Sequence, residues 1–232
     1  SVTAGGRDLW SAPSTVMLLP PLPFLQPATP PPMSVGKGMA VERLGFGTWA
    51  WGNKLLWGYD PAADAALQEA FNVVTTPTSP FDRRRYFFDT GDSYGTGALE
   101  GRAESLLGDF RRESAAPERA VLGTKLAVYP NRLTGASFEA ACRASLERMG
   151  RDQIEIVQAH WSAQNFQPWQ EPALWDGLAR CHEAGLARAV GTSNFGPEQV
   201  CACKSQAASA FLPRLPPSSL TASRACIGSS PR

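Results

Sequence analysis

Four polar residues near the middle of the chain have types and positions that suit proton donation to a carbonyl group. Asp89, Lys125 and His160 each end a short apolar run that predicts a β-strand, and Tyr94 follows Asp89 by five residues in a glycine-rich loop. In proteins built from alternating strands and helices, residues at the carboxyl ends of neighbouring strands converge on one site. We therefore expect these four side chains to lie close together.

The chemistry of the four groups is complementary. A phenol with a pKa of about 10 is a weak acid at neutral pH, and an adjacent ammonium group stabilises the phenolate. Lys125 would supply that ammonium group to Tyr94. Asp89 would hold Lys125, and His160 would position the carbonyl oxygen by hydrogen bonding. Taken singly, these residues also have structural explanations, such as a helix cap, a solvated lysine or a hydrogen-bonded core histidine.

The sequence disfavours other kinds of catalytic site. No nucleophile with an activating base is recognisable. The two histidines, His160 and His182, do not form a metal-ligand pattern, so we expect no metal. Reduction of a carbonyl then needs a hydride, which proteins take from a nicotinamide cofactor.

A repeated strand and helix unit would position these residues. Apolar runs begin at Tyr86, Ala120, Ile154 and Ala187, at intervals of 34, 34 and 33 residues, and each is followed by a segment with helical spacing. An earlier run covers residues 44–48. Parallel strands with crossover helices predict an α/β fold, either an open doubly wound sheet or a closed barrel.

One of these helical segments shows the pattern clearly. Thr134 or Ser137 is available as its N-cap. Six residues then share one helical face: Phe138, Ala141, Cys142, Ser145, Leu146 and Met149.

The four polar residues and their neighbours resemble the signature of the aldo-keto reductases. That family has an aspartate in a strand-end Asp-Thr, a tyrosine five residues later, a lysine in a Thr-Lys on the next strand and a histidine in a Gln-x-His-Trp on the one after. These motifs match Asp89, Tyr94, Lys125 and His160. Segments 45–49, 104–108 and 191–195 also look like family signatures. The resemblance extends roughly over residues 44–200 and implies a TIM (β/α)8 barrel.

The resemblance also implies NADPH as the cofactor and a small aldehyde or ketone as the substrate. By this likeness, Ser193 and Asn194 would hold the nicotinamide carboxamide. The other residues of the cofactor site would be Gly47, Thr48, Trp49 and Asp89. The substrate pocket would be lined by Trp49, Tyr94, His160 and Trp161.

Several segments are similar to a narrower group within the family, the plant chloroplast pyridoxal reductases. They are residues 45–53, 55–59, 92–97, 141–146 and 174–178. This likeness implies reduction of pyridoxal to pyridoxine with NADPH, in vitamin B6 salvage. It also favours a chloroplast location, with the cytoplasm as the alternative.

A competing pattern lies at the first strand. Residues 45–50, Gly-Phe-Gly-Thr-Trp-Ala, fit a loose dinucleotide-binding fingerprint, with Asp64 or Glu69 near the expected acidic position. The residues that follow, 51–53, do not start a helix, and the strand-end residues would have no role in that scheme. We therefore favour the barrel over a Rossmann-type sheet.

Both ends of the chain differ in composition from the middle. Residues 1–40 are rich in proline and poor in acidic groups, which predicts a disordered tail or an organelle transit peptide. We expect a partial barrel over residues 41–200, interrupted at 75–85 by a proline-containing stretch that ends a helix and looks foreign to the parent fold. Residues 201–232, rich in Ser, Pro and Ala, predict a second disordered tail. The sequence thus predicts a barrel truncated after about five βα units, with an incomplete cofactor site.

Composition disfavours several kinds of partner. The 232 residues include 22 Lys and Arg against 21 Asp and Glu, and the basic residues do not cluster. We therefore expect no nucleic-acid partner and no membrane partner. The five cysteines are scattered and odd in number, which favours a reducing compartment. The oligomeric state is not indicated. The alternative to a reductase is an inactive truncated product or a non-catalytic interaction protein on the same scaffold, similar to potassium-channel β subunits.

Overall fold

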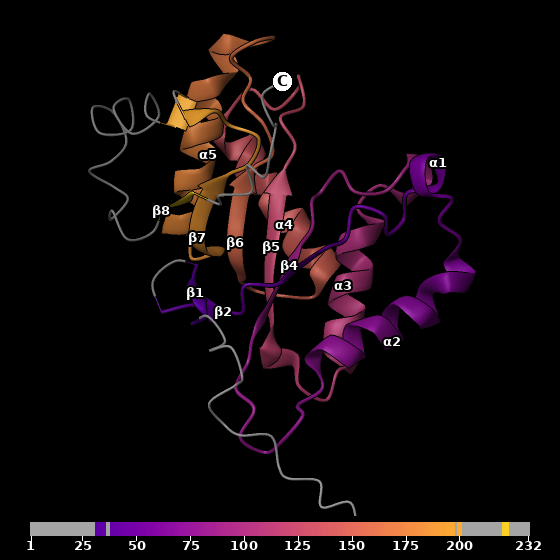
Figure 1. Ribbon diagram of the computed structural model, residues 1–232. Helices are drawn as coiled ribbons and strands as arrows, with labels where there is room; N and C mark the ends of the chain where they lie inside the picture. Colours follow the sequence, from indigo (N-terminus) through magenta and orange to yellow (C-terminus); the bar gives the residue numbers. More distant parts are fainter. Residues whose placement is uncertain (1–30, 36–37, 198, 201–219, 223–232) are drawn as a thin grey trace, which may run out of the picture. The chain divides into compact units, whose positions relative to one another are not determined.

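The parallel strands of this chain follow one another in space in the order in which they occur in the sequence. A computed structural model describes residues 31–35, 38–197, 199–200 and 220–222. Within these residues, one sheet has six strands in the order β3-β4-β5-β6-β7-β8, all parallel (Figure 1). The strands are β3 (Gly45–Gly47), β4 (Tyr86–Asp89), β5 (Ala120–Leu126), β6 (Ile154–Ala159), β7 (Ala187–Thr192) and β8 (Leu220–Ala222). A doubly wound sheet reverses its strand order at a switch point. The uninterrupted order therefore confirms the winding of a partial TIM-type barrel.

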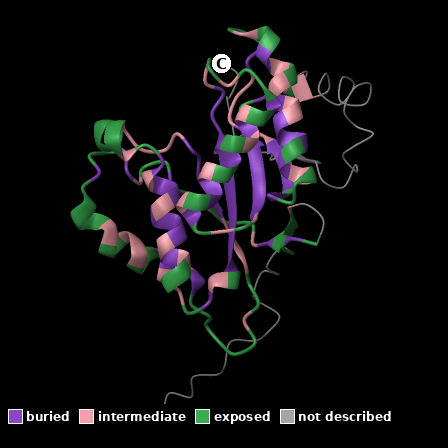
Figure 2. Ribbon diagram, turned by 180° about the vertical axis from the view of Figure 1, so that it is seen from behind, coloured by how far each residue is buried: buried purple, intermediate pink, exposed green. Residues whose placement is uncertain are grey.

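Helices connect and cover the strands. They are α1 (Lys54–Trp57), α2 (Asp64–Thr75), α3 (Arg102–Glu113), α4 (Gly135–Met149) and α5 (Glu171–Glu183). Helices α2 to α5 each pack against the next, and their inner faces join the strands in the main hydrophobic core. Figure 2 shows this division, with buried strands behind helices whose outer faces are exposed. Single turns of 3-10 helix lie at Pro61–Ala63, Gly97–Leu99, Pro117–Arg119 and Pro168–Gln170.

Helix α4 forms as its sequence predicts. Thr134 and Ser137 form a reciprocal capping box, in which each side chain accepts a hydrogen bond from the backbone N–H of the other residue. The helix ends at Gly150, which adopts the left-handed conformation. All six residues predicted to share one face are buried.

The packing of α3 against α4 depends on a glycine. A Cβ atom at Gly108 would lie 2.6 Å from the Cα atom of Met149 and 2.7 Å from its carbonyl oxygen. Only a residue without a side chain lets the two backbones approach this closely. The same helix carries Glu104, which is fully buried and paired with Arg148 of α4 and Thr124 of β5.

Two short strands lie within residues 31–41, a stretch that composition mostly assigns to a disordered tail. Strands β1 (Met33–Ser34) and β2 (Ala40–Val41) form a short antiparallel pair. Met39, which precedes β2, is 1% exposed and belongs to a small cluster with Ile156 and Ala189 of the sheet. Burial of this side chain explains why the segment orders despite its composition. The prediction for residues 1–30 lies outside the described residues.

A second difference concerns residues 201–232, where the composition predicts no regular element. Strand β8 pairs with β7 in parallel register, with Leu220 opposite Val190 and Ala222 opposite Thr192. The edge of β7 offers backbone N–H and C=O groups that a further strand can satisfy. Three residues are too few to produce the alternating pattern by which a strand is predicted. The prediction for 201–219 and 223–232 lies outside the described residues.

The proline-containing stretch between α2 and β4 is anchored rather than loose. Helix α2 ends at Thr75, before the prolines, as the sequence predicts. The side chain of Asp82, 4% exposed, accepts hydrogen bonds from Arg84 at 2.7 Å and from the buried Arg119 at 3.0 Å. These bonds hold the pKa of Asp82 well below its ordinary value. The foreign origin of this stretch stays a prediction.

In the described part of the chain, no helix combines the length and the apolar character that crossing a bilayer requires.

Replacement of Gly108 by alanine tests the close contact between α3 and α4. Alanine favours an isolated helix over glycine by about 1 kcal/mol, yet here the methyl group would push two backbones apart. We expect Gly108→Ala to lower the free energy of unfolding by about 1–3 kcal/mol in urea denaturation. Gly47→Ala, at a site with nothing within 4 Å of the added Cβ, should have a much smaller effect. A stabilised Gly108→Ala protein would contradict the packing argument.

Candidate active site

Lys125 is the centre of the site. It lies on β5, is 5% exposed, and its ammonium group donates three hydrogen bonds. The acceptors are Asp89 Oδ2 at 2.6 Å, the carbonyl oxygen of Thr90 at 2.8 Å and the hydroxyl oxygen of Tyr94 at 3.1 Å. A buried charge is tolerated when it is paired and its donors are satisfied. The structure therefore brings Asp89, Tyr94 and Lys125 together as the sequence predicts.

The direction of the Lys125–Tyr94 bond follows from the chemistry of the ammonium group. An ammonium nitrogen has three donors and no acceptor. The oxygen of Tyr94 must therefore accept, and its own hydrogen is left to point toward another acceptor. The lysine nitrogen also lies 4.9 Å from the centre of the Tyr94 ring. The phenol of Tyr94 therefore lies beside a fixed positive charge.

His160 faces Tyr94 from the end of β6. The two rings meet edge to face with centroids 5.6 Å apart. Burial, with a further contribution from the charge of Lys125, lowers the pKa of His160 to about 4. The imidazole is therefore neutral at pH 7, so it can donate one hydrogen bond and accept one.

Two further hydrogen bonds hold the ends of β3 and β4 together. The backbone N–H of Thr48 and its hydroxyl both donate to the carbonyl oxygen of Asp89, at 2.9 and 3.1 Å. Thr48 is 0% exposed, so its side chain acts on the strands rather than facing a ligand. Gly47 lies opposite Asp89 in the ladder.

Ser193 and Asn194 lie at the end of β7, beside His160. The side-chain nitrogen of Asn194 donates to the carbonyl oxygen of His160 at 2.8 Å and to Ser193 Oγ at 3.1 Å. Asn194 has a φ of 59°, a left-handed conformation that asparagine tolerates better than most residues. No described residue donates to its amide oxygen. Ser193 and Asn194 together thus offer a donor and an acceptor, the set that a carboxamide needs.

Aromatic side chains border the site. Trp161 packs against His160, with centroids 4.6 Å apart. Trp49 is 49% exposed, and its ring centroid lies 6.5 Å from that of Tyr94. Trp57, on α1, meets Trp49 edge to face at 5.9 Å and is 57% exposed. Trp57 was not predicted to line the pocket, and the only sequence signal for it is its place in the stretch 55–59.

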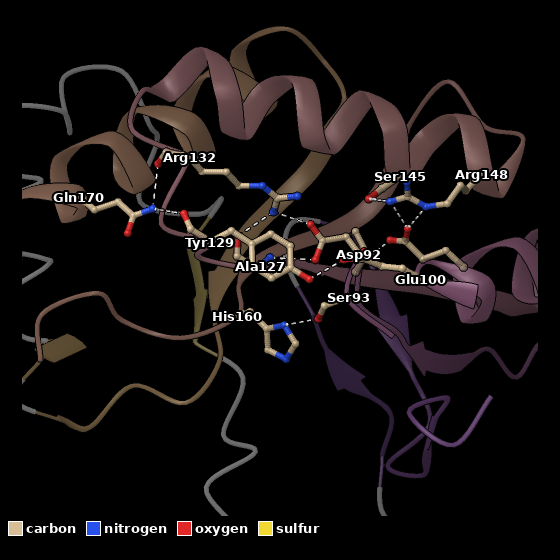
Figure 3. Close-up of polar contacts among 12 residues, drawn as sticks. Asp92, Ser93, Glu100, Ala127, Tyr129, Arg132, Ser145, Arg148, His160 and Gln170 are labelled. Carbon is tan, nitrogen blue, oxygen red and sulfur yellow. Dashed lines mark hydrogen bonds and ion pairs between the residues drawn. The ribbon is translucent and has the colours of Figure 1, made fainter. Parts of the chain in front are cut away.

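A polar network fixes the loop that carries Tyr94. Asp92 Oδ1 accepts from the backbone N–H of Ala127 at 2.9 Å, and Asp92 Oδ2 pairs with Arg132 at 2.5 Å (Figure 3). Gln170 donates to the carbonyl oxygens of Tyr129 and Arg132. Sequence reasoning missed this network because its members come from three separate loops.

The fold and the site together define a class of protein. It is a barrel-type α/β protein in which an aspartate, a tyrosine, a lysine and a histidine meet at the carboxyl ends of adjacent strands. Residues 43–213 match the model of the aldo/keto reductase family. The chain belongs to this family.

Individual relatives agree with this assignment. The chain is similar to a chloroplastic pyridoxal reductase of Arabidopsis thaliana, with 49% identity over 166 residues that cover 70% of this chain and 44% of that protein. It is 30% identical to the aldo-keto reductase YhdN of Bacillus subtilis over 173 residues, which cover 70% and 46% of the two chains. The matched region thus spans less than half the length of these relatives.

Solved structures are also similar in fold. An aldo-keto reductase from Klebsiella pneumoniae, solved in complex with NADP and acetate, is 25% identical with a TM-score of 0.57. The match covers 73% of this chain and 51% of that one. The thermostable aldo-keto reductase Tm1743, solved with the inhibitor epalrestat, has a TM-score of 0.59 at 21% identity, covering 75% and 58%.

The lowered pKa of His160 has a measurable consequence for stability. An unfolded histidine takes up a proton near pH 6.5, whereas folded His160 resists protonation until about pH 4. Between these values the unfolded state binds more protons, so the free energy of unfolding falls as the pH falls. We expect a loss of up to about 3 kcal/mol by pH 4.

Two measurements check this expectation. The imidazole proton resonance of His160, assigned by its absence in His160→Gln, should titrate near pH 4. The His160→Gln protein should lose less stability than the parent chain between pH 6.5 and pH 4. A midpoint near 6.5 would show that the ring is not buried as described.

Proposed function

We propose that this chain contains the proton-donating half of an NADPH-dependent carbonyl reductase, which converts an aldehyde or ketone to an alcohol. One observation carries the proposal: the ammonium group of Lys125 donates to the oxygen of Tyr94, so the phenolic hydrogen is directed to another acceptor. The oxygen of a bound carbonyl is the acceptor that this geometry suits. Family membership supports the same reaction class.

Each of the four residues has a separate role in proton transfer. Tyr94 acts as the general acid and gives its proton to the substrate oxygen as negative charge develops there. Lys125 stabilises the resulting phenolate, and Asp89 holds the ammonium group in place through a hydrogen bond of 2.6 Å. His160, neutral at pH 7, donates a hydrogen bond that orients the carbonyl oxygen.

The residues at the end of β7 fit the nicotinamide end of NADPH. Ser193 and Asn194 supply a donor and an acceptor for its carboxamide, and Gly47 and Trp49 lie across the site at the end of β3. When bound, the cofactor supplies the hydride that reduces the carbonyl carbon. The NADP and NADPH named with the related structures support this choice. Thr48 contributes through the strand ends rather than through direct contact.

Pyridoxal is the substrate we propose. Its flat heteroaromatic ring suits a site bordered by Trp49, Trp57 and Trp161, because aromatic rings pack favourably edge to face or offset. The 49% identity to a chloroplastic pyridoxal reductase supports this substrate and a chloroplast location.

Replacement of Tyr94 by phenylalanine tests the acid. The variant keeps the ring but removes the proton, so we expect NADPH-dependent reduction of pyridoxal to fall by about 10²- to 10⁴-fold. The measurement is NADPH absorbance with the full chain, alongside quenching of tryptophan emission by NADPH to report cofactor binding. Tyr86→Phe, at the start of β4, is the matched control and should keep full activity.

The outcomes of this experiment separate the alternatives. Equal activity in Tyr94→Phe would overturn the assignment of the acid. A folded parent chain that neither quenches with NADPH nor reduces pyridoxal would instead favour the non-catalytic interaction protein.

Replacement of Trp57 tests the aromatic substrate. Removal of the indole ring takes away a packing surface for a flat ring but not for a short aliphatic chain. We expect Trp57→Ala to raise the KM for pyridoxal about three- to tenfold and to leave the KM for propanal nearly unchanged. Leu55→Ala, also on α1 and 83% exposed, is the control. An equal change for both substrates would argue against stacking by Trp57.

A further inference from the structure

We propose that Ser93 is a positioning residue that sets the tautomer of His160. The Ser93 hydroxyl donates to Nδ1, so that Nε2 carries the hydrogen offered to the substrate oxygen. The catalytic consequence rests on the proposed function, whereas the tautomer can be measured without it.

The contact is direct and is made by the residue beside the proposed acid. Ser93 Oγ lies 3.3 Å from His160 Nδ1. Figure 3 shows the hydroxyl facing this nitrogen, while the other ring nitrogen points away from Ser93. Within the described part of the chain, this hydroxyl has no second hydrogen-bond partner.

The electronic state of the ring makes the direction of this hydrogen bond important, because a serine hydroxyl can either donate to Nδ1 or accept from it. Because burial keeps His160 neutral at pH 7, one ring nitrogen carries a hydrogen and the other a lone pair. A hydrogen on Nδ1 would leave a lone pair on Nε2, which repels the lone pairs of a carbonyl oxygen. A hydroxyl that donates to Nδ1 stabilises the opposite tautomer, the one that can bind a carbonyl.

Both partners are held in place by other bonds. Asp92, the neighbour of Ser93, accepts from Ala127 and Arg132, and its backbone N–H donates to the carbonyl oxygen of Lys125 at 3.0 Å. The backbone N–H of His160 donates to the carbonyl oxygen of Leu126 at 3.0 Å. The Ser93–His160 contact is therefore a fixed feature of two anchored segments, one on each side of β5.

The tautomer can be read directly by nitrogen NMR. Long-range proton–nitrogen spectra of the ¹⁵N-labelled full chain at pH 7 distinguish a protonated ring nitrogen from an unprotonated one, and His160→Gln assigns the signals. We expect the parent chain to show hydrogen on Nε2 and a hydrogen-bonded lone pair on Nδ1. In Ser93→Ala the Nδ1 signal should move toward that of a free lone pair, with a mixture of tautomers.

Variants at the same position separate the hydroxyl from the shape of the side chain. Ser93→Thr keeps the hydroxyl and should keep the spectrum of the parent chain. Ser93→Cys nearly preserves the size of the side chain but donates weakly, so its Nδ1 signal should be intermediate. This variant provides the test if Ser93→Ala does not fold. Ser105→Ala, a partly buried serine on α3, is the control and should change nothing at His160.

Kinetics then test the consequence for catalysis. Ser93→Ala should lower kcat for pyridoxal about three- to tenfold, the range expected for one lost hydrogen bond, with the KM for NADPH unchanged. Hydrogen on Nδ1 in the parent chain, or an unchanged spectrum in Ser93→Ala, would overturn the inference.

The failure of this inference is distinguishable from failure of the proposed function. The expected tautomer in a chain that binds NADPH but reduces no aldehyde would overturn the reductase proposal and leave the role of Ser93 toward His160 standing. If the chain is active but Ser93→Ala alters neither the spectrum nor kcat, the role of Ser93 is overturned and the reductase proposal stands.

Discussion

The buried ammonium group of Lys125 constrains the whole site. Removing a charge from water costs several kcal/mol unless the charge is paired and its donors are satisfied. Here the ammonium group has three acceptors: Asp89, the carbonyl oxygen of Thr90 and the hydroxyl oxygen of Tyr94. They lie at the end of β4 and in the loop that follows it. The same bonds that make the charge tolerable also fix where the phenol lies. Stability and the proposed chemistry therefore depend on the same few atoms.

A second buried charge supports β5 from its other face. Side chains alternate along a strand, so Thr124 points away from Lys125 and toward the helices. Its hydroxyl bonds to the buried carboxylate of Glu104, which also pairs with Arg148. Burial raises the pKa of Glu104, against the lowering effect of Arg148. Strand β5 is thus held on one face by a cation with its acceptors and on the other by a carboxylate with its donors.

The features that the sequence predicts are those with local or periodic signals. The strand starts near 86, 120, 154 and 187 and the capped α4 follow from spacing and hydrophobic pattern, and the strand-end residues follow from the rule that parallel strands converge. Features that depend on distant partners were missed. Met39 orders through contacts with Ile156 and Ala189, and Asp92 meets Arg132 forty residues away, which no window of sequence reveals. Trp57 was missed for a different reason: Trp49 is near it in the sequence, but the contact between the two rings depends on how the loop between them folds.

The site also depends on the register of three adjacent strands. Asp89 lies opposite Gly123, and Lys125 lies opposite Gln158. Because side chains alternate with a period of two, a slip of one residue would turn Lys125 toward the helices and bring Thr124 to the site. Gly123 helps to fix this register, since the Phe87 ring fills the space beside it and a Cβ there would lie 2.4 Å from the ring. A residue without a side chain therefore contributes to the position of the lysine, together with the carboxylate that binds it.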